Sequence, residues 1–298
     1  MEKVGFVGIG IMGTPMSKRL LGAGYPLVVY DARPEAVSPL VEMGAEAASS
    51  PADLAERCGK VVTMLPNSAI VEEVVLGDSG LARGLAPGSV LIDMSSSVPT
   101  STRKIAAALA ARSVEMVDAP VSGGPVGAAD GSLTIMVGGK EEVYRACLPI
   151  LETMGRNIFL IGPIGSGHTM KTINNMMAAI NILGVCEALV LGAKAGLDPR
   201  RIVEVASTGS GRSFALDTKA VRHVLANDYQ PGFTTDLMYK DVDIATTLGR
   251  QLGVPLLAAN VAQHMLGVAR GRGMSHLDNI CVIKLIEEVA GIKVVPEG

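Results

Sequence analysis

The sequence predicts two domains of different fold class: an N-terminal α/β domain with a doubly wound, mostly parallel sheet, and a C-terminal all-α domain. Two observations predict this division. Short β-branched runs alternate with helical patterns up to about residue 160, and strand signals nearly vanish after it. The 298 residues, 48% of them apolar, suffice for two cores, and we place the domains at residues 1–163 and 164–298.

The elements of the first domain follow from apolar runs of strand length and from the helical spacing between them. Helices that begin at Ser, Asp or Pro in cap positions should cover both faces of the sheet. The predicted strands are residues 4–7, 27–30, 60–64, 89–93, 115–118, 134–137 and 158–161. After a first helix that starts near residue 13, the predicted helices are residues 51–57, 70–76, 100–112 and 141–154.

A sustained helical pattern at about residues 168–195, which ends before Gly196, predicts a long helix that joins the two domains. At ~1.5 Å per residue it would be about 40 Å long, enough to form the spine of the second domain. Its apolar stripe is expected to face the core and consists of Ile173, Met177, Ile180 and Leu183. Further helices are predicted at residues 199–207, 214–226, 240–252, 255–269 and 277–290.

Composition and charge exclude several classes of partner. A net charge of −3 without a basic tract gives no electrostatic basis for binding nucleic acid. The fifteen uncharged residues between Lys171 and Glu187 fall short of the roughly 18 to 20 that cross a bilayer, so a buried helix is expected there. The cysteines are too scattered for a disulfide framework or a zinc site, which indicates a reducing cytoplasm and no bound metal; they are Cys58, Cys147, Cys186 and Cys281.

The first strand leads into a glycine pattern, G-x-G-x-x-G, formed by Gly8, Gly10 and Gly13 around Ile11 and Met12. A lone glycine triplet is more often a simple turn. Here a strand precedes it, a helix follows it, and Asp31 ends the next strand eighteen residues after Gly13. This is the arrangement that binds a pyrophosphate at a helix N-terminus and a ribose at the acid, so it predicts a nicotinamide dinucleotide.

The choice between the two nicotinamide cofactors depends on two opposite charges. Asp31 should accept the ribose hydroxyls and repel a 2′-phosphate, which favours NAD. Arg33, two residues later, could partly neutralise that repulsion. We therefore expect NAD to be preferred and NADP to be used less well.

Segment DAPVSGGP, which starts at Asp118, follows a predicted strand at the carboxyl edge of the sheet. Ser122 offers a hydroxyl, and Gly123 and Gly124 offer unobstructed N–H groups, so the three would form a nest for a carboxylate. The simpler interpretation is a glycine-rich turn.

In the segment GHTMKTINN, Lys171 and Asn175 are four residues apart and share one helix face. A partly buried lysine can give a proton to a carbonyl oxygen and take one from an alcohol. The alternative is a lysine that extends to solvent beside two asparagines. We interpret His168 as a residue of the helix start rather than a catalyst.

Two further cations lie in the second domain. Lys240, in the segment LMYKD, could contact cofactor or substrate, but alone it would be an ordinary surface lysine. Arg212, in the segment SGRSF, could clamp a second anionic group of the substrate or be a loop cation, and the sequence favours neither.

Together these segments resemble the β-hydroxyacid dehydrogenase family. The glycine-rich opening, TMLPNS at residues 63–68, DMSS at 93–96, DAPVSGG at 118–124, GxxxKxxNN at 167–175 and the later Lys-Asp pair have that family's order and spacing. The resemblance covers essentially the whole chain. It implies a Rossmann-type domain joined to an all-α domain by a long helix, with the active site in the cleft between them.

The resemblance also implies roles for individual residues. Lys171 would be the catalytic acid/base, Asn175 would orient the substrate, and residues 122–124 would hold its carboxylate. The residues expected at the cofactor are Leu65, Pro66 and Ser96, which would line its nicotinamide side, and Lys240, which would face cofactor and substrate.

The implied activity is hydride transfer between nicotinamide and a small 3-hydroxy acid or its semialdehyde, such as 3-hydroxyisobutyrate or tartronate semialdehyde. A homo-oligomer, dimer or tetramer, is implied as well. Two alternatives remain at this point: an enzyme like 6-phosphogluconate dehydrogenase, and a catalytically silent dinucleotide-binding module. That dehydrogenase is considerably longer and carries a histidine where Asn174 stands here.

Overall fold

A computed structural model describes residues 1–295 of the chain. The chain forms two compact units, Met1–Lys171 and Thr172–Gly298, and each has a hydrophobic core of its own. The units divide inside the long helix, a little later in the chain than the domain boundary placed after residue 163.

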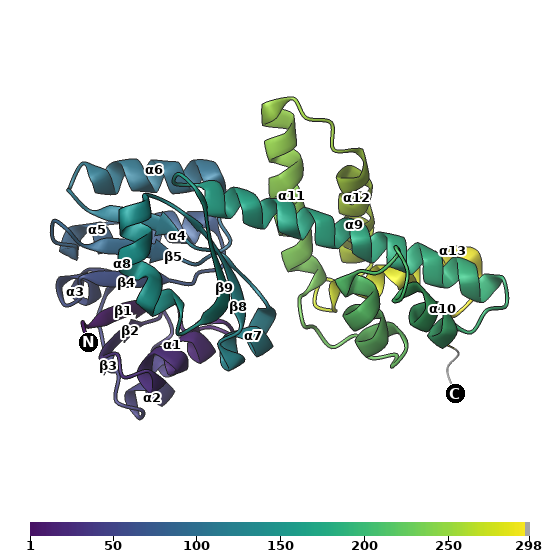
Figure 1. The fold of residues 1–298 in the computed structure, drawn as a ribbon, viewed down its shortest axis with the longest axis horizontal. Helices are drawn as coiled ribbons and strands as arrows, with labels where there is room; N and C mark the ends of the chain where they lie inside the picture. The colour runs from purple at the N-terminus through teal and green to yellow at the C-terminus, as the bar shows by residue number, and fades with distance from the viewer. Residues whose placement is uncertain (296–298) are drawn as a thin grey trace. The chain divides into compact units, whose positions relative to one another are not determined.

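The first unit is built on one sheet, whose strands over the described residues have the order β3-β2-β1-β4-β5-β6-β8-β7, with β9 paired to β8 (Figure 1). The strands are β1 (Val4–Val7), β2 (Leu27–Tyr30), β3 (Glu46–Ala47), β4 (Lys60–Thr63), β5 (Val90–Asp93), β6 (Glu115–Asp118), β7 (Val121–Ser122), β8 (Leu133–Gly138) and β9 (Gly155–Gly162). Strands β1 to β6 pair in parallel, whereas β8 runs antiparallel to β6 and β7. The predicted doubly wound, mostly parallel sheet is confirmed, and its strand order reverses between β1 and β4, where such sheets bind ligands.

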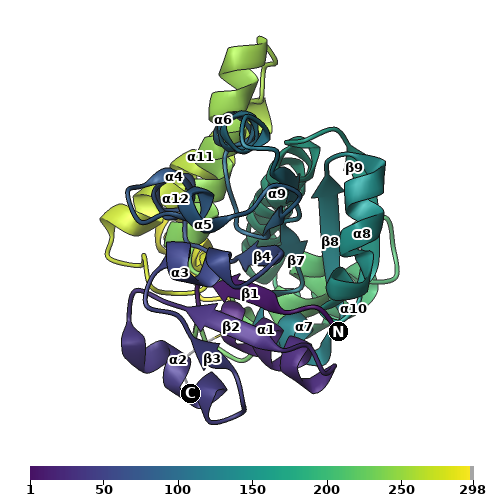
Figure 2. The ribbon, with the colours of Figure 1, turned by 90° about the vertical axis from the view of Figure 1, so that its left-hand side faces the viewer.

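Helices cover both faces of this sheet, as predicted. Within β4, Val61 packs into one core and Val62 into the other, because successive strand side chains point to opposite faces. Figure 2 shows α3, α4 and α5 on one side of the strands and α1, α7 and α8 on the other. The helices of the first unit are α1 (Gly13–Gly22), α2 (Pro34–Val41), α3 (Pro51–Glu56), α4 (Ser68–Leu76), α5 (Leu81–Gly84), α6 (Pro99–Ala110), α7 (Gly124–Asp130) and α8 (Glu141–Leu151).

The second unit is helical and gathers around α9 (Ser166–Lys194), the long helix predicted from the sequence (Figure 1). Gly196 follows it with a positive φ of 85°. The other elements are α10 (Pro199–Ala206), the π-helix η1 (Ala215–Val224), α11 (Thr235–Leu252), α12 (Leu257–Gly271), the 3₁₀-helix η2 (Asn279–Val282) and α13 (Ile283–Ala290). Helix α11 begins earlier than predicted because the hydroxyl of Thr234 caps it by accepting from the N–H of Leu237 at 3.2 Å.

The predicted core stripe of α9 is wrong in its first half. Ile173 and Met177 are 40% and 54% exposed, and the buried face consists instead of Ala179, Ile182, Cys186 and Leu189. The helix is apolar on nearly all sides, so the spacing of its apolar residues could not select the face that packs.

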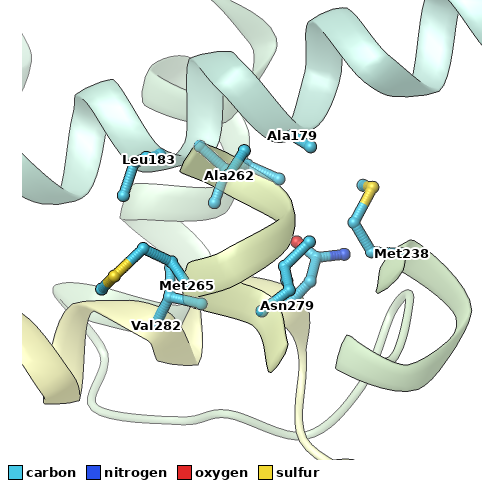
Figure 3. Close-up of a pocket in the computed structure, with 9 residues that line it drawn as sticks. Ala179, Leu183, Met238, Ala262, Met265, Asn279 and Val282 are labelled. Carbon is cyan, nitrogen blue, oxygen red and sulfur yellow. The ribbon is translucent and has the colours of Figure 1, made fainter. Parts of the chain in front are cut away.

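By length and a mean hydropathy of 1.9, α9 would also qualify as a membrane-spanning helix, but 44% of that stretch is buried inside the protein. We interpret it as the core helix of the second unit, as expected from the sequence. Figure 3 shows a small cavity beside it, where the fully buried side chain of Asn279 lies near Met238 and Ala179. The Asn279 amide donates to the carbonyl oxygen of Phe233 at 2.8 Å.

Buried thiols make the stability of the fold sensitive to alkali. Burial raises the pKa of Cys58 to about 11 and that of Cys147 to about 12, from an ordinary value of 9.0. A raised pKa contributes stability that is complete below the unfolded value and is lost as the pH rises through the folded one. We expect the urea midpoint of unfolding to fall above about pH 9. The urea midpoint of Cys147→Ala should fall less steeply with pH than that of the wild type. An equal fall in both proteins would contradict the raised pKa of Cys147.

Candidate active site

The glycine turn between β1 and α1 has the backbone of a phosphate-binding loop. Gly8 has a φ of +98°, and a Cβ at Gly13 would run into the carbonyl oxygen of Gly8, so the fold itself requires both glycines. A Cβ at Gly10 would have no neighbour within 4 Å. The open space above Gly10 fits a pyrophosphate, beside Ile11 and Met12, where α1 begins without a cap from any described side chain.

Asp31 is fixed against this turn. One carboxylate oxygen accepts from the N–H of Ile9 at 2.8 Å, and the other accepts from the N–H and Nε of Arg33 at 2.9 and 3.2 Å. The acid therefore lies next to the glycine turn, where the adenosine ribose of a dinucleotide would bind. Asp31 and Arg33, the two opposite charges noted in the sequence, form a direct ion pair.

The loops after β4 and β5 are joined by a hydrogen bond. The N–H of Leu65 donates to the hydroxyl of the buried Ser95 at 2.9 Å, and the N–H of Ser95 donates to the Asp93 carboxylate at 3.1 Å. Pro66 is exposed and Ser96 is half-buried. The residues expected on the nicotinamide side thus lie on two loops held together at the carboxyl edge of the sheet.

The glycines after β7 adopt backbone conformations that glycine tolerates best. Ser122 ends β7, and Gly123 and Gly124 follow with φ values of +132° and +63°. A Cβ at Gly123 would lie 3.1 Å from the Leu133 side chain, whereas one at Gly124 would meet nothing within 4 Å.

The start of α9 is fastened to the same edge of the sheet by Asp118. Its two carboxylate oxygens accept from the N–H groups of Gly165 and His168, each at 2.7 Å. Burial raises the pKa of Asp118, and the nearby His168 and the two N–H donors oppose that rise. This anchor positions the first turns of α9, which carry Lys171.

One turn after Lys171, the side chain of Asn175 is buried and held on both sides. Its amide nitrogen donates to the Asp241 carboxylate at 2.5 Å, and its oxygen accepts from Asn174 at 2.9 Å. Lys240 lies 3.3 Å from the other Asp241 oxygen. The sequence analysis named the Lys-Asp pair but gave Asp241 no role, and the structure shows that this acid fixes the Asn175 side chain.

Arg212 has a partner within the second unit. Its Nε donates to the Asp217 carboxylate at 2.7 Å, and its side chain is 71% exposed. Among residues 1–295, no three His, Cys, Asp or Glu side chains gather into a group that could hold a metal ion.

Two family profiles together match almost the whole chain. One, described as the NAD binding domain of 6-phosphogluconate dehydrogenase, matches residues 3–162. The other, described as NAD-binding of NADP-dependent 3-hydroxyisobutyrate dehydrogenase, matches residues 165–286.

Individual relatives match over nearly their full length. The 2-(hydroxymethyl)glutarate dehydrogenase of Eubacterium barkeri is 38% identical over 98% of this chain and 97% of its own. The mitochondrial 3-hydroxyisobutyrate dehydrogenase of Mus musculus is 38% identical over 96% and 87%. A solved structure of Mycobacterium tuberculosis 3-hydroxyisobutyrate dehydrogenase with L-serine has a TM-score of 0.90 and 31% identity, over 96% of this chain and 99% of that one.

The chain belongs to the β-hydroxyacid dehydrogenase family. It is an NAD(P)-dependent oxidoreductase that acts on the hydroxyl group of hydroxyacids. The resemblance read from the sequence motifs is confirmed, and so is the α/β domain followed by a helical one.

The glycine turn supplies a matched pair of substitutions. Gly13→Ala should lower the melting temperature, because its Cβ collides with the Gly8 carbonyl. Gly10→Ala should leave the melting temperature of the free protein unchanged and weaken NADH binding about tenfold or more, because its Cβ fills the pyrophosphate space. Thermal unfolding and NADH fluorescence titration measure the two effects. If Gly10→Ala bound NADH as tightly as the wild type does, the assignment of the cofactor pyrophosphate to this turn would be wrong.

Proposed function

We propose that the protein catalyses the reversible oxidation of a primary alcohol on the carbon next to the α-carbon of a small carboxylic acid, with NAD as the preferred cofactor. The substrates named for its relatives, 3-hydroxyisobutyrate and 2-(hydroxymethyl)glutarate, share this group, and so does the L-serine of the solved structure. One observation supports this proposal above all. Hydrogen bonds to Asp118 fix the start of the helix that contains Lys171 at the carboxyl edge of the sheet, where the glycine turn also lies.

Lys171 is the proposed acid/base. In the reductive direction its ammonium gives a proton to the carbonyl oxygen of the semialdehyde, and in the oxidative direction its amine takes the proton from the hydroxyl. Asn175 lies one helical turn away, and its amide, fixed by Asp241 and Asn174, orients the same oxygen. Bound nicotinamide supplies or accepts the hydride.

The remaining roles concern binding. Residues 122–124 hold the substrate carboxylate with the Ser122 hydroxyl and the N–H groups of Gly123 and Gly124. Leu65, Pro66 and Ser96 line the nicotinamide side. Lys240, beside Asp241, contributes a positive charge toward cofactor and substrate.

Arg212 is the proposed contact for a second anionic group, such as the distal carboxylate of a dicarboxylic substrate. It would exchange its exposed ion pair with Asp217 for that group, at little cost because surface ion pairs are weak.

We also infer a compartment and an assembly state for the protein. The four free, buried cysteines support a reducing compartment such as the cytoplasm. Exposed apolar residues on α12, which are Leu257, Val261 and Val268, support a homo-oligomer.

An assay with NAD and NADP against a panel of hydroxy acids tests this function. The panel contains 3-hydroxyisobutyrate, L-serine, glycerate, 2-(hydroxymethyl)glutarate and, as a matched control, the 2-hydroxy acid lactate. We expect turnover with the 3-hydroxy acids and little with lactate. Equal activity on lactate, or none on any 3-hydroxy acid, would overturn the proposal.

Lys171→Ala should lower kcat by ~10²- to 10⁴-fold, because the proton donor is lost, while NADH still binds. The measurement is steady-state kinetics together with NADH fluorescence titration. The matched control is Lys18→Ala, which removes an exposed lysine on α1. A Lys171→Ala enzyme with near-normal kcat would remove the lysine from the mechanism.

Asp31→Asn should narrow the preference for NAD, because it removes the charge that repels a 2′-phosphate while Arg33 remains. We expect kcat/KM to rise with NADP and to fall with NAD. Arg33→Gln is the converse variant and should lower kcat/KM with NADP. A wild-type enzyme that uses both cofactors equally, or prefers NADP, would show that Arg33 outweighs Asp31.

A further inference from the structure

His168 is fully buried, and both of its ring nitrogens have partners. Its Nε2 lies 2.9 Å from the carbonyl oxygen of Ser95, and its Nδ1 lies 2.7 Å from the hydroxyl of Thr102. A carbonyl oxygen can only accept, so Nε2 carries the proton and donates it to Ser95. The ring thus connects the first turn of α9 to the loop after β5 and to α6.

From Ser95 the connection continues to the next loop. The Ser95 hydroxyl accepts from the N–H of Leu65, so a chain of two hydrogen bonds joins His168 to the loop after β4. Ser96 is the next residue after Ser95. Both loops that carry proposed nicotinamide contacts are therefore held to one histidine.

At its other end the histidine is fixed by its own backbone. The N–H of His168 donates to Asp118, and Lys171 follows three residues later on the same helix. Residues three apart on a helix are neighbours on its surface, so the orientation of this turn sets the position of the Lys171 ammonium.

Two buried carboxylates flank the ring as well. Asp118 lies 3.5 Å from Nδ1 and Asp93 lies 3.9 Å from Nε2, at the ends of β6 and β5. The second Asp93 oxygen is buried and has no hydrogen-bond partner among the described residues. A polar ring among apolar strands and buried acids costs desolvation energy that an apolar side chain of similar size would avoid. A core residue selected for packing alone would not need these directed bonds.

We propose that His168 is a positioning residue that fixes the loops bearing Leu65 and Ser96 relative to Lys171. It touches neither cofactor nor substrate. It joins the loops that hold the nicotinamide to the helix that carries Lys171. In this way it sets the distance between the nicotinamide and the proton donor. This inference rests on the proposed function for the roles of those three residues.

Two conservative variants separate the bond to Ser95 from the space that the ring fills. A glutamine amide at position 168 can still reach the Ser95 carbonyl, whereas the shorter asparagine can reach only the Thr102 side. We expect His168→Asn to lower kcat about 10- to 100-fold, as misplaced reacting groups do, and His168→Gln to stay within about threefold of the wild type. Thr102→Val removes the Nδ1 bond and the hydroxyl contact with the Val98 carbonyl within α6 but keeps the bond to Ser95, so its kcat should also stay within about threefold of the wild type. Equal kcat values for the Asn and Gln variants would overturn the proposal.

Binding without turnover provides the second readout. ADP-ribose lacks the nicotinamide, and in the proposed site the glycine turn and Asp31 would hold it, so its affinity should be unchanged in His168→Asn. The affinity for NADH should fall about three- to tenfold, because the loops at its nicotinamide end are released. A purely structural defect would lower the affinities for NADH and ADP-ribose by the same factor, and that result would overturn the proposal.

Ser95→Ala tests the same connection from its other end and needs no change at the histidine. It removes the bond to Leu65 and should reproduce the selective loss of NADH affinity if His168→Asn does not fold. An unchanged ratio of NADH to ADP-ribose affinity in Ser95→Ala would overturn the proposal. If the wild type oxidises no 3-hydroxy acid, the proposed function fails, and the affinity ratio still decides the role of His168.

Discussion

The two hydrogen bonds that the Asp118 carboxylate accepts determine where α9 begins, and the arrangement of the proposed site follows from that position. The carboxylate accepts them from backbone N–H groups at the start of α9, inside the protein and at the carboxyl end of β6. Because a buried acid without partners would be costly, this pairing fixes where the long helix leaves the sheet. The close approach also requires glycine at positions 138 and 167, where a Cβ would collide with Asp118 or with the neighbouring backbone. Helix α9 therefore starts at the sheet edge where a parallel α/β fold binds its ligands.

The chemistry follows from that placement. The sheet supplies the glycine turn, Asp31 and the loops after β4, β5 and β7, and in the proposed site each would hold a different part of cofactor or substrate. Helix α9 brings a lysine and, one turn later, an asparagine whose amide is fixed by Asp241. In the proposed site, the binding residues come from loops at strand ends, while the proton-transfer residue comes from a helix whose start is hydrogen-bonded to the same strands.

Much of this arrangement could be predicted from the sequence, because it is determined by patterns within short segments of the chain. The glycine turn, Asp31 and the parallel strands depend on spacing within short segments. The packed face of α9 could not be predicted, since that helix is apolar on nearly all sides and only tertiary packing selects Ala179 and Ile182 over Ile173 and Met177. The bond from Asn175 to Asp241 joins residues 66 positions apart, and the bonds of His168 to Ser95 and Thr102 are also long-range. Asp93 and Asp118 each end an apolar strand, and this local feature could have indicated a buried polar network but was not used in that way.

Isotope tracing can show whether this chain moves a hydride directly between a 3-hydroxy acid and nicotinamide. The protein is incubated with NAD and 3-hydroxyisobutyrate deuterated at the hydroxymethyl carbon, and the reduced cofactor is analysed by mass spectrometry. We expect one deuterium in each molecule of reduced cofactor and none released to water. Reduced cofactor without deuterium, or no reduction while cofactor and acid are both bound, would contradict direct hydride transfer.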